Sequence, residues 1–136
     1  MKGNFIKSVP PLPYASLKVL DLSNNNITTL EADALVQLTS LETLNLEENK
    51  LSSVQAKNFE GLNSLTHLFL NGNLLSRLDS GVFFFVEDHL QKLDVSYNKI
   101  SSIGRDAFAM MFDLTTLATM VHDAVLRLPY RGVMPH

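Results

Sequence analysis

Apolar residues recur along this chain at fixed places. Residues 41–51 carry apolar side chains at places one, four, six and eleven, with an asparagine at place nine. The same frame begins at residues 17, 65 and 90, so successive copies are 24, 24 and 25 residues apart. A constant period of about 20 to 29 residues indicates stacked coils in a solenoid. We therefore predict four coils, with the bounds 17–40, 41–64, 65–89 and 90–113.

The middle of each copy has the pattern of a short, half-buried strand. Places four and six are apolar and alternate with mostly polar neighbours, which is the period of two expected when one strand face lies in a core. Equivalent strands should pair about 4.8 Å apart as a parallel sheet. The side chains at place four, which this interpretation buries, are Leu20, Leu44, Leu68 and Leu93.

An asparagine follows every predicted strand at place nine. Its amide offers both a donor and an acceptor. We expect these amides to stack in line and to satisfy backbone groups that the turn leaves facing the apolar interior. The four residues are Asn25, Asn49, Asn73 and Asn98.

Further apolar places follow each asparagine and predict the convex half of the core. One of them is occupied in successive copies by Leu35, Phe59, Phe83 and Phe108. Because aromatic side chains bury large areas, we expect the three rings to form a spine. The third copy has one extra residue between Phe83 and Leu90. A bulge or an extra turn that absorbs this residue should leave Phe84 or Phe85 partly exposed.

The two ends depart from the frame. Residues 1–16 match only the last part of a copy, and we interpret them as an N-terminal half-repeat or cap. Residues 114–136 leave two interpretations open. In a degraded fifth copy, Leu114 and Leu117 fit but the later places do not. The spacing favours an amphipathic helix that caps the last coil, with Asp113 as N-cap and Pro129 as stop, before a loose tail. The apolar face of that helix would be Met110, Leu114, Leu117, Val121, Ala124 and Leu128.

The complete frame, LxxLxLxxNxL followed by a leucine-like place and a phenylalanine, resembles the typical 24-residue subclass of the leucine-rich repeat family. This subclass occurs in the ectodomains of Toll-like receptors, Slit-like proteins and small proteoglycans. The resemblance covers residues 17–113. It implies the α/β class: a horseshoe-shaped solenoid with a concave parallel β-sheet and short helical or irregular convex segments. It also implies recognition of a partner by the concave face, and an extracellular setting.

Composition excludes some partners and leaves the compartment open. A net charge of −3 over 136 residues predicts neither nucleic acid nor an anionic membrane as partner. No apolar run reaches the 18 or so residues of a membrane-spanning helix. Cysteine is absent, which excludes disulfides and thiolate metal sites. Without cysteine-rich caps or a secretory signal, we expect a cytoplasmic protein if this chain is complete, and an extracellular or cell-surface one if it is a fragment.

The sequence predicts no enzyme, cofactor or metal site. No serine lies in a Gly-x-Ser-x-Gly elbow, and no glycine-rich loop could hold phosphates. The four histidines lack metal-ligand spacing. Two carboxylate pairs, Glu47–Glu48 and Glu87–Asp88, are expected in open, wet positions where a shifted pKa is not predicted.

The outward-facing places of the predicted sheet are the candidate site. Phe69 stands out, because Leu68 and Leu70 claim the core and direct it outward. An outward aromatic residue with a polar rim is typical of an interface anchor. Carboxylates outnumber bases around it, so we expect a protein partner with basic groups. The predicted partner-binding residues are Asp21, Asn45, Glu47, Glu48, His67, Phe69, Asn71, Lys92, Asp94 and Tyr97.

The sequence also contains one candidate modification site, and it is compatible with several functional hypotheses. Asn26-Ile27-Thr28 is an N-glycosylation triplet, with Asn26 as acceptor. The leading hypothesis is a non-enzymatic protein-recognition module from an extracellular receptor, adhesion or matrix protein. The alternatives are an intracellular scaffold or regulatory subunit, and the targeting region of an enzyme whose catalytic domain lies outside this chain.

Overall fold

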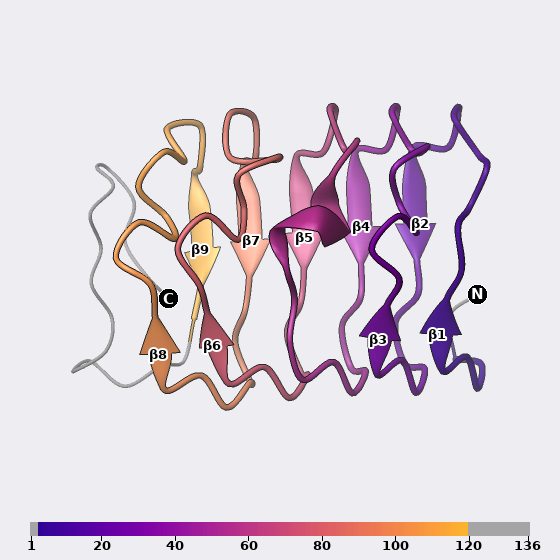
Figure 1. The fold of residues 1–136 in the computed structure, drawn as a ribbon, viewed down its shortest axis with the longest axis horizontal. Helices are drawn as coiled ribbons and strands as arrows, with labels where there is room; N and C mark the ends of the chain where they lie inside the picture. The colour runs from indigo at the N-terminus through magenta and orange to yellow at the C-terminus, as the bar shows by residue number, and fades with distance from the viewer. Residues whose placement is uncertain (1–2, 120–136) are drawn as a thin grey trace.

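The structure is a computed structural model that describes residues 3–119. Its largest feature is a parallel sheet of five short strands in chain order (Figure 1). Each strand pairs in register with the same places of the next copy, so that Leu44 lies opposite Leu20 and Leu68. This arrangement confirms the predicted sheet. Its strands are β2 (Val19–Asp21), β4 (Thr43–Asn45), β5 (His67–Phe69), β7 (Lys92–Asp94) and β9 (Thr116–Ala118).

Shorter strands run in the opposite direction on the other side of the coils (Figure 1). They form two separate pairs, β1 (Ser8–Val9) with β3 (Thr29–Leu30), and β6 (Arg77–Leu78) with β8 (Ser102–Ile103). The second coil has instead a 3-10 helix, η1 (Ala56–Phe59). No other helix occurs within residues 3–119. Of the helical or irregular convex segments that were predicted, almost all are irregular, because segments this short close single turns and do not nucleate α-helices.

The core follows the repeated apolar places. All four leucines at place four of the predicted copies are buried, as is Leu117 in the coil after them. On the convex side, Phe83 lies between Phe59 and Phe108, with ring centroids 5.8 and 6.2 Å away. The predicted aromatic spine is thus confirmed. Neighbouring coils share one continuous apolar interior, so each coil depends on the next for its burial.

The asparagines form the predicted ladder. The Asn49 amide nitrogen donates to the carbonyl oxygens of Leu22, at 3.0 Å, and of Leu46, at 3.1 Å. Its Oδ1 accepts the Ile27 N–H of the preceding coil at 3.0 Å. Asn73 and Asn98 repeat this arrangement one and two coils further on. Every amide therefore joins two coils through otherwise unpaired backbone groups.

The N-terminal half-repeat stacks on the first coil in the same way. The Ile6 N–H donates to Asn25 Oδ1 at 3.2 Å, and the Asn26 N–H donates back to the Ile6 carbonyl at 3.0 Å. Val9 is buried against this coil. Residues 3–16 thus cover the apolar end of the first coil.

The extra residue of the third coil is absorbed by wider turns. The Glu87 N–H bonds the Phe83 carbonyl and the Leu90 N–H bonds the Val86 carbonyl, each four residues back. In the second coil the corresponding bond, from Leu65 to Leu62, spans three residues. Phe84 is 62% exposed beside a partly buried Phe85, as predicted.

The turn in the third coil also changes the environment predicted for Glu87. Glu87 is partly buried instead of open to solvent. Burial raises the pKa of its carboxyl above the ordinary value, and the charge of Asp88 raises that pKa further. The repeat frame could not show this, because Glu87 lies in the turn that absorbs the extra residue, where the third copy no longer matches the others.

We expect Glu87→Gln to raise the melting temperature near pH 7. A carboxyl with a raised folded pKa destabilises the fold while it is charged, and this penalty disappears below the unfolded pKa. The advantage of Glu87→Gln should therefore shrink as the pH falls and vanish below about 4.5. Thermal denaturation followed by circular dichroism from pH 3.5 to 8 measures it. Asp88→Asn should give a smaller gain of the same sign, and a pH-independent difference would contradict the assignment.

The C-terminal helix expected from Met110 onward is wrong for the described residues. Thr116–Ala118 form β9, which pairs with β7 so that Leu117 lies opposite Leu93. The Thr115 and Thr116 N–H groups both donate to the Gln91 carbonyl. A spacing of three between leucines fits a helix and a repeat equally well, and here the free edge of β7 selects the strand. Residues 120–128 of the expected helix lie outside the described residues.

Candidate functional site

The outward side of the five-stranded sheet brings the predicted site residues together. Each strand buries its central leucine and leaves its two flanking residues facing away from the core. Because the strands are in register, His67 lies beside Thr43 and Lys92, and Phe69 lies between Asn45 and Asp94. Five residues of the predicted surface are therefore neighbours on three adjacent strands.

Phe69, His67 and Lys92 form an aromatic and cationic cluster at the centre of this surface. The Lys92 ammonium lies 5.4 Å from the Phe69 ring centroid, and the His67 ring centroid lies 6.5 Å from it. The Lys92 contact is a cation–π interaction. His67 Nδ1 is 2.9 Å from the Thr66 hydroxyl. Phe69 is partly covered by this packing, so it is less open than the sequence suggested, but it faces outward as predicted.

Asp21, Asn45 and Asp94 have a structural role that sequence reasoning missed. They share place five of their coils, and each Oδ1 accepts the backbone N–H two residues later at 2.9 to 3.0 Å. The two aspartates also accept the hydroxyls of Ser23 and Ser96. These Asx turns close the exit of each strand. The recurrence of Asp or Asn at place five could have indicated this structural role from the sequence.

Phe69 breaks that row. A phenyl ring has no hydrogen-bond acceptor oxygen, so the third coil lacks the side-chain closure of its neighbours. Nearby, the buried Oδ1 of Asn71 finds no hydrogen-bond partner among the described residues. The third coil thus gives up a local hydrogen bond at the position where it presents an aromatic ring.

Two carboxylates of the second coil flank the cluster. Glu47 Oε2 accepts the Asn71 side-chain amide at 3.3 Å. The Glu48 carboxylate lies over Gly72, where an added Cβ would come 2.3 Å from Oε1. Glu48, Gly72 and Tyr97 occupy equivalent turn places with positive φ, a conformation rare for residues other than glycine and asparagine. Tyr97 is 68% exposed in this turn row.

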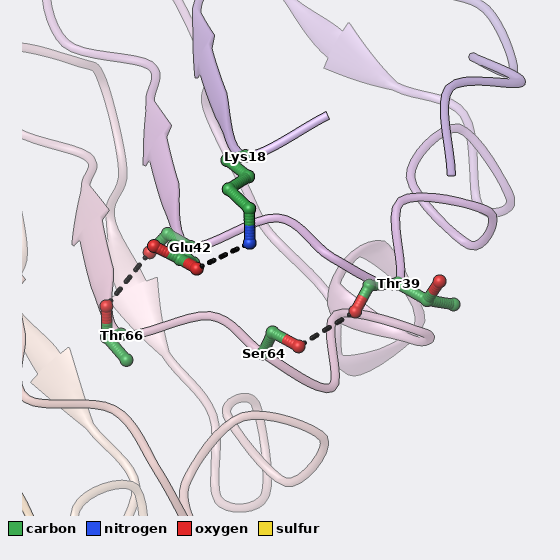
Figure 2. A network of polar contacts seen from close by, with 5 residues as sticks. All are labelled: Lys18, Thr39, Glu42, Ser64 and Thr66. Atoms are coloured by element: carbon green, nitrogen blue, oxygen red, sulfur yellow. Dashed lines mark hydrogen bonds and ion pairs between the residues drawn. The ribbon is translucent and has the colours of Figure 1, made fainter. Parts of the chain in front are cut away.

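Polar contacts at the start of the strands join the first three coils (Figure 2). Lys18 Nζ lies 3.1 Å from Glu42 Oε2, and the Thr66 hydroxyl donates to the Glu42 carbonyl at 3.1 Å. The Ser64 hydroxyl donates to the Thr39 carbonyl at 2.9 Å. The Lys18–Glu42 pair is exposed and adds little stability. It does leave Lys18 partly neutralised at the edge of the site.

The described residues hold a small hollow but no group of metal-ligating side chains. Within residues 3–119, no three His, Asp or Glu side chains come close enough together to hold a metal ion. A hollow of about 180 Å³ lies between the first two coils, lined by Thr28, Leu30, Ser53, Gln55 and Asn58 among others. It borders β3 and η1, away from the concave sheet.

Comparison with known families agrees with this geometry. The family profile described as "Leucine rich repeat" matches residues 3–51, 15–75 and 40–87, and a second profile of the same description matches 88–109. The chain belongs to the leucine-rich repeat family. Its typical subclass, inferred from the frame, is supported by a Toll-like receptor among similar solved structures. No curated protein matches the chain.

That solved structure is the "Crystal structure of TLR13-ssRNA13 complex", with a TM-score of 0.80 and 27% sequence identity. The match covers 87% of this leucine-rich repeat chain but only 17% of the receptor chain. This chain therefore spans less than a fifth of the length of that receptor chain. Among the residues described, no helix has the length and apolar character needed to cross a membrane.

Proposed function

We propose that this leucine-rich repeat chain is a non-enzymatic recognition module that binds a protein partner on its concave sheet, with Phe69 as the central contact. The proposal is supported by a rigid, in-register sheet that presents one aromatic cluster within a mostly polar surface. Interfaces of this kind concentrate their binding energy in a few central aromatic or basic side chains, and the surrounding contacts exclude water.

The observation that carries the proposal is the exceptional residue at place five of the third coil. In the other three predicted copies this place closes its own turn with an aspartate or asparagine. Phe69 cannot do so, and it places an apolar ring on a surface facing solvent instead. A fold selected for stability alone would favour asparagine here, so the phenylalanine indicates a function outside the fold.

The charges around Phe69 favour a partner with basic groups. Glu47 and Glu48 lie on the coil next to Phe69, and Asp94 lies opposite it. Of the nearby bases, Lys18 is paired with Glu42 and Lys92 lies over the Phe69 ring. A basic segment entering this surface would meet uncompensated carboxylates, which would accelerate its association.

The solved neighbour raises single-stranded RNA as an alternative ligand, since its title names a complex with ssRNA13. A phosphate backbone requires several unpaired basic side chains. The carboxylates of Glu47, Glu48 and Asp94 oppose such a ligand, so we favour a protein. We further propose that the chain is part of an extracellular or cell-surface receptor, adhesion or matrix protein, on the strength of its similarity to a receptor of the same family.

Phe69→Asn is the decisive variant. It should restore the Asx turn of the third coil and keep or raise the melting temperature, while weakening partner binding by about 30-fold or more, the level of a hot-spot residue. The partner is first captured through a photo-crosslinking amino acid at position 69, with the same amino acid at exposed position 84 as control. Calorimetry then gives the affinity of the purified pair. Unchanged affinity in Phe69→Asn would exclude the concave site.

Charge reversal separates the two ligand classes. Glu47→Lys with Glu48→Lys should slow association of a basic protein partner by about tenfold, because surface charges act mainly on the encounter rate. The same double variant should strengthen binding of a short single-stranded RNA. Fluorescence anisotropy with labelled RNA at physiological salt measures the second effect. Specific RNA binding by the unaltered chain would overturn the protein-partner proposal.

A further inference from the structure

A second surface, at place ten of each coil, lies just after the asparagine ladder. Its residues lie between the asparagine at place nine and the apolar residue at place eleven. All but one are exposed, and Asn26 is partly exposed. From the half-repeat to the fourth copy they are Phe5, Asn26, Lys50, Leu74 and Lys99. The row accepts large aromatic, aliphatic and charged side chains alike, so bulk added at this place does not disturb the stacking of coils.

Asn26 is held in this row with its backbone fixed. Its N–H donates to the Ile6 carbonyl at 3.0 Å, and the next residue, Ile27, is buried with its N–H on Asn49 Oδ1. Thr28 is exposed, and its hydroxyl makes only a long contact of 3.4 Å to the Lys7 carbonyl. Asn26-Ile27-Thr28 is the single Asn-x-Ser/Thr triplet in the 136-residue sequence. The acceptor Asn26 and the hydroxyl residue Thr28 therefore both lie on an accessible surface.

Phe5 is the neighbour of Asn26 in this row. The bond between Asn26 and Ile6 joins the two chain segments side by side. Phe5 is 85% exposed, although its own segment is fixed to the first coil on either side of it. An apolar ring left in water at a fixed position has a free-energy cost that a covering group would remove. The protein supplies no such cover among the described residues.

We propose that Asn26 carries an N-linked glycan whose first sugar packs against the Phe5 ring. The carbohydrate donor is a lipid-linked diphosphate oligosaccharide. The Asn26 amide nitrogen forms a bond to C1 of the donor sugar, the C1–oxygen bond to the diphosphate breaks, and the lipid diphosphate leaves while one amide proton passes to solvent. The sugar ring has an apolar C–H face, which can cover an aromatic ring and keep its hydroxyl groups in water.

This surface is independent of the concave site. Place ten lies beyond the turn that ends each strand, whereas Phe69 lies within a strand of the sheet. Failure of the glycan proposal would therefore leave the recognition proposal standing, and the reverse also holds. The two are tested by different measurements on the same chain.

The first experiment expresses the full chain behind a cleavable secretory leader in mammalian cells. Mass spectrometry of the secreted protein should find a glycan on the peptide that contains Asn26, removable by peptide N-glycosidase. Asn26→Gln and Thr28→Ala should abolish it, whereas Thr28→Ser, which keeps the triplet, and Asn63→Gln, at an exposed asparagine outside it, should retain it. A secreted, folded chain without this glycan would overturn the proposal.

The second experiment tests the contact with Phe5. Melting temperatures are compared with and without enzymatic removal of the glycan, in the unaltered chain and in Phe5→Ser. The glycan should raise the melting temperature of the unaltered chain by about 2–4 °C. In Phe5→Ser this gain should be lost, while the unglycosylated forms of the two chains should melt within about 1 °C of each other. An equal gain in both chains would refute the packing of the sugar on Phe5.

Discussion

Phe83→Ala should lower the free energy of unfolding by about 3–5 kcal/mol, the range for a fully buried aromatic residue. Phe83 has no solvent exposure and is the middle ring of the spine, with partners at 5.8 and 6.2 Å. Its truncation removes both ring pairs and leaves a void between three coils. Because the coils stabilise one another as nearest neighbours, a void in the third coil weakens two interfaces at once.

Phe84→Ala is the matched control, because the adjacent phenylalanine is 62% exposed. Its effect should stay within about 0.5 kcal/mol. Phe83→Leu should cost less than Phe83→Ala, since Leu35 fills the same place in the first coil. Urea denaturation followed by far-ultraviolet circular dichroism measures all three, because the chain has no tryptophan. A loss below about 1 kcal/mol for Phe83→Ala would show that the spine does not hold the coils together.

The sheet and the asparagine ladder could be predicted because each coil has the same residue types at the same places. Once Leu44 and Leu68 occupy the same place, their burial and their register across the sheet follow from the period. The same argument placed His67, Phe69 and Lys92 on neighbouring strands. It could not give the position of the Lys92 ammonium over the Phe69 ring, since that depends on side-chain rotamers that no period fixes.

The sequence was insufficient where local hydrogen bonding or tertiary context decides. It placed Asp21 and Asp94 on the outward surface, but it did not show that their oxygens also close Asx turns. Leu114 and Leu117 suit both a helix and a strand, and the free edge of β7 made the difference. The frame predicts an open Glu87, because it does not specify how a one-residue insertion turns the chain. Each of these features depends on backbone geometry between the repeated places.

The row at place five also shows how a repeat reveals function. Three of the four predicted copies close the turn with an aspartate or asparagine, and Phe69 in the third copy stands out against them without any comparison between species. Ala118, at the same place in the coil after the fourth copy, also lacks an acceptor, but its small side chain adds no aromatic surface. Phe69 would be unremarkable in a chain without repeats, because single outward aromatic residues are common. Here the coils on both sides of Phe69 close their turns with an asparagine or aspartate, and Phe69 cannot do so.

Asn73→Ala should lower the free energy of unfolding by about 3 kcal/mol, given about 1–3 kcal/mol for each buried group left unpaired. Its amide nitrogen donates to the Leu46 and Leu70 carbonyls at 3.0 Å, and its Oδ1 accepts the Leu51 N–H at 3.0 Å. Alanine can replace none of these bonds, and the site is buried, with Asn73 only 4% exposed. The loss therefore falls on two coils at once.

Asn63→Ala provides the control in the preceding coil, because this asparagine is exposed and its removal should change stability by no more than about 0.5 kcal/mol. Hydrogen exchange adds a local measurement. In Asn73→Ala the Leu51 amide should lose protection beyond the global change, because its acceptor is gone, while the Ile27 amide keeps its bond to Asn49. Equal protection losses at both amides would mean that the ladder acts as packing alone. A selective loss at Leu51 would show that each asparagine holds its own pair of coils through hydrogen bonds.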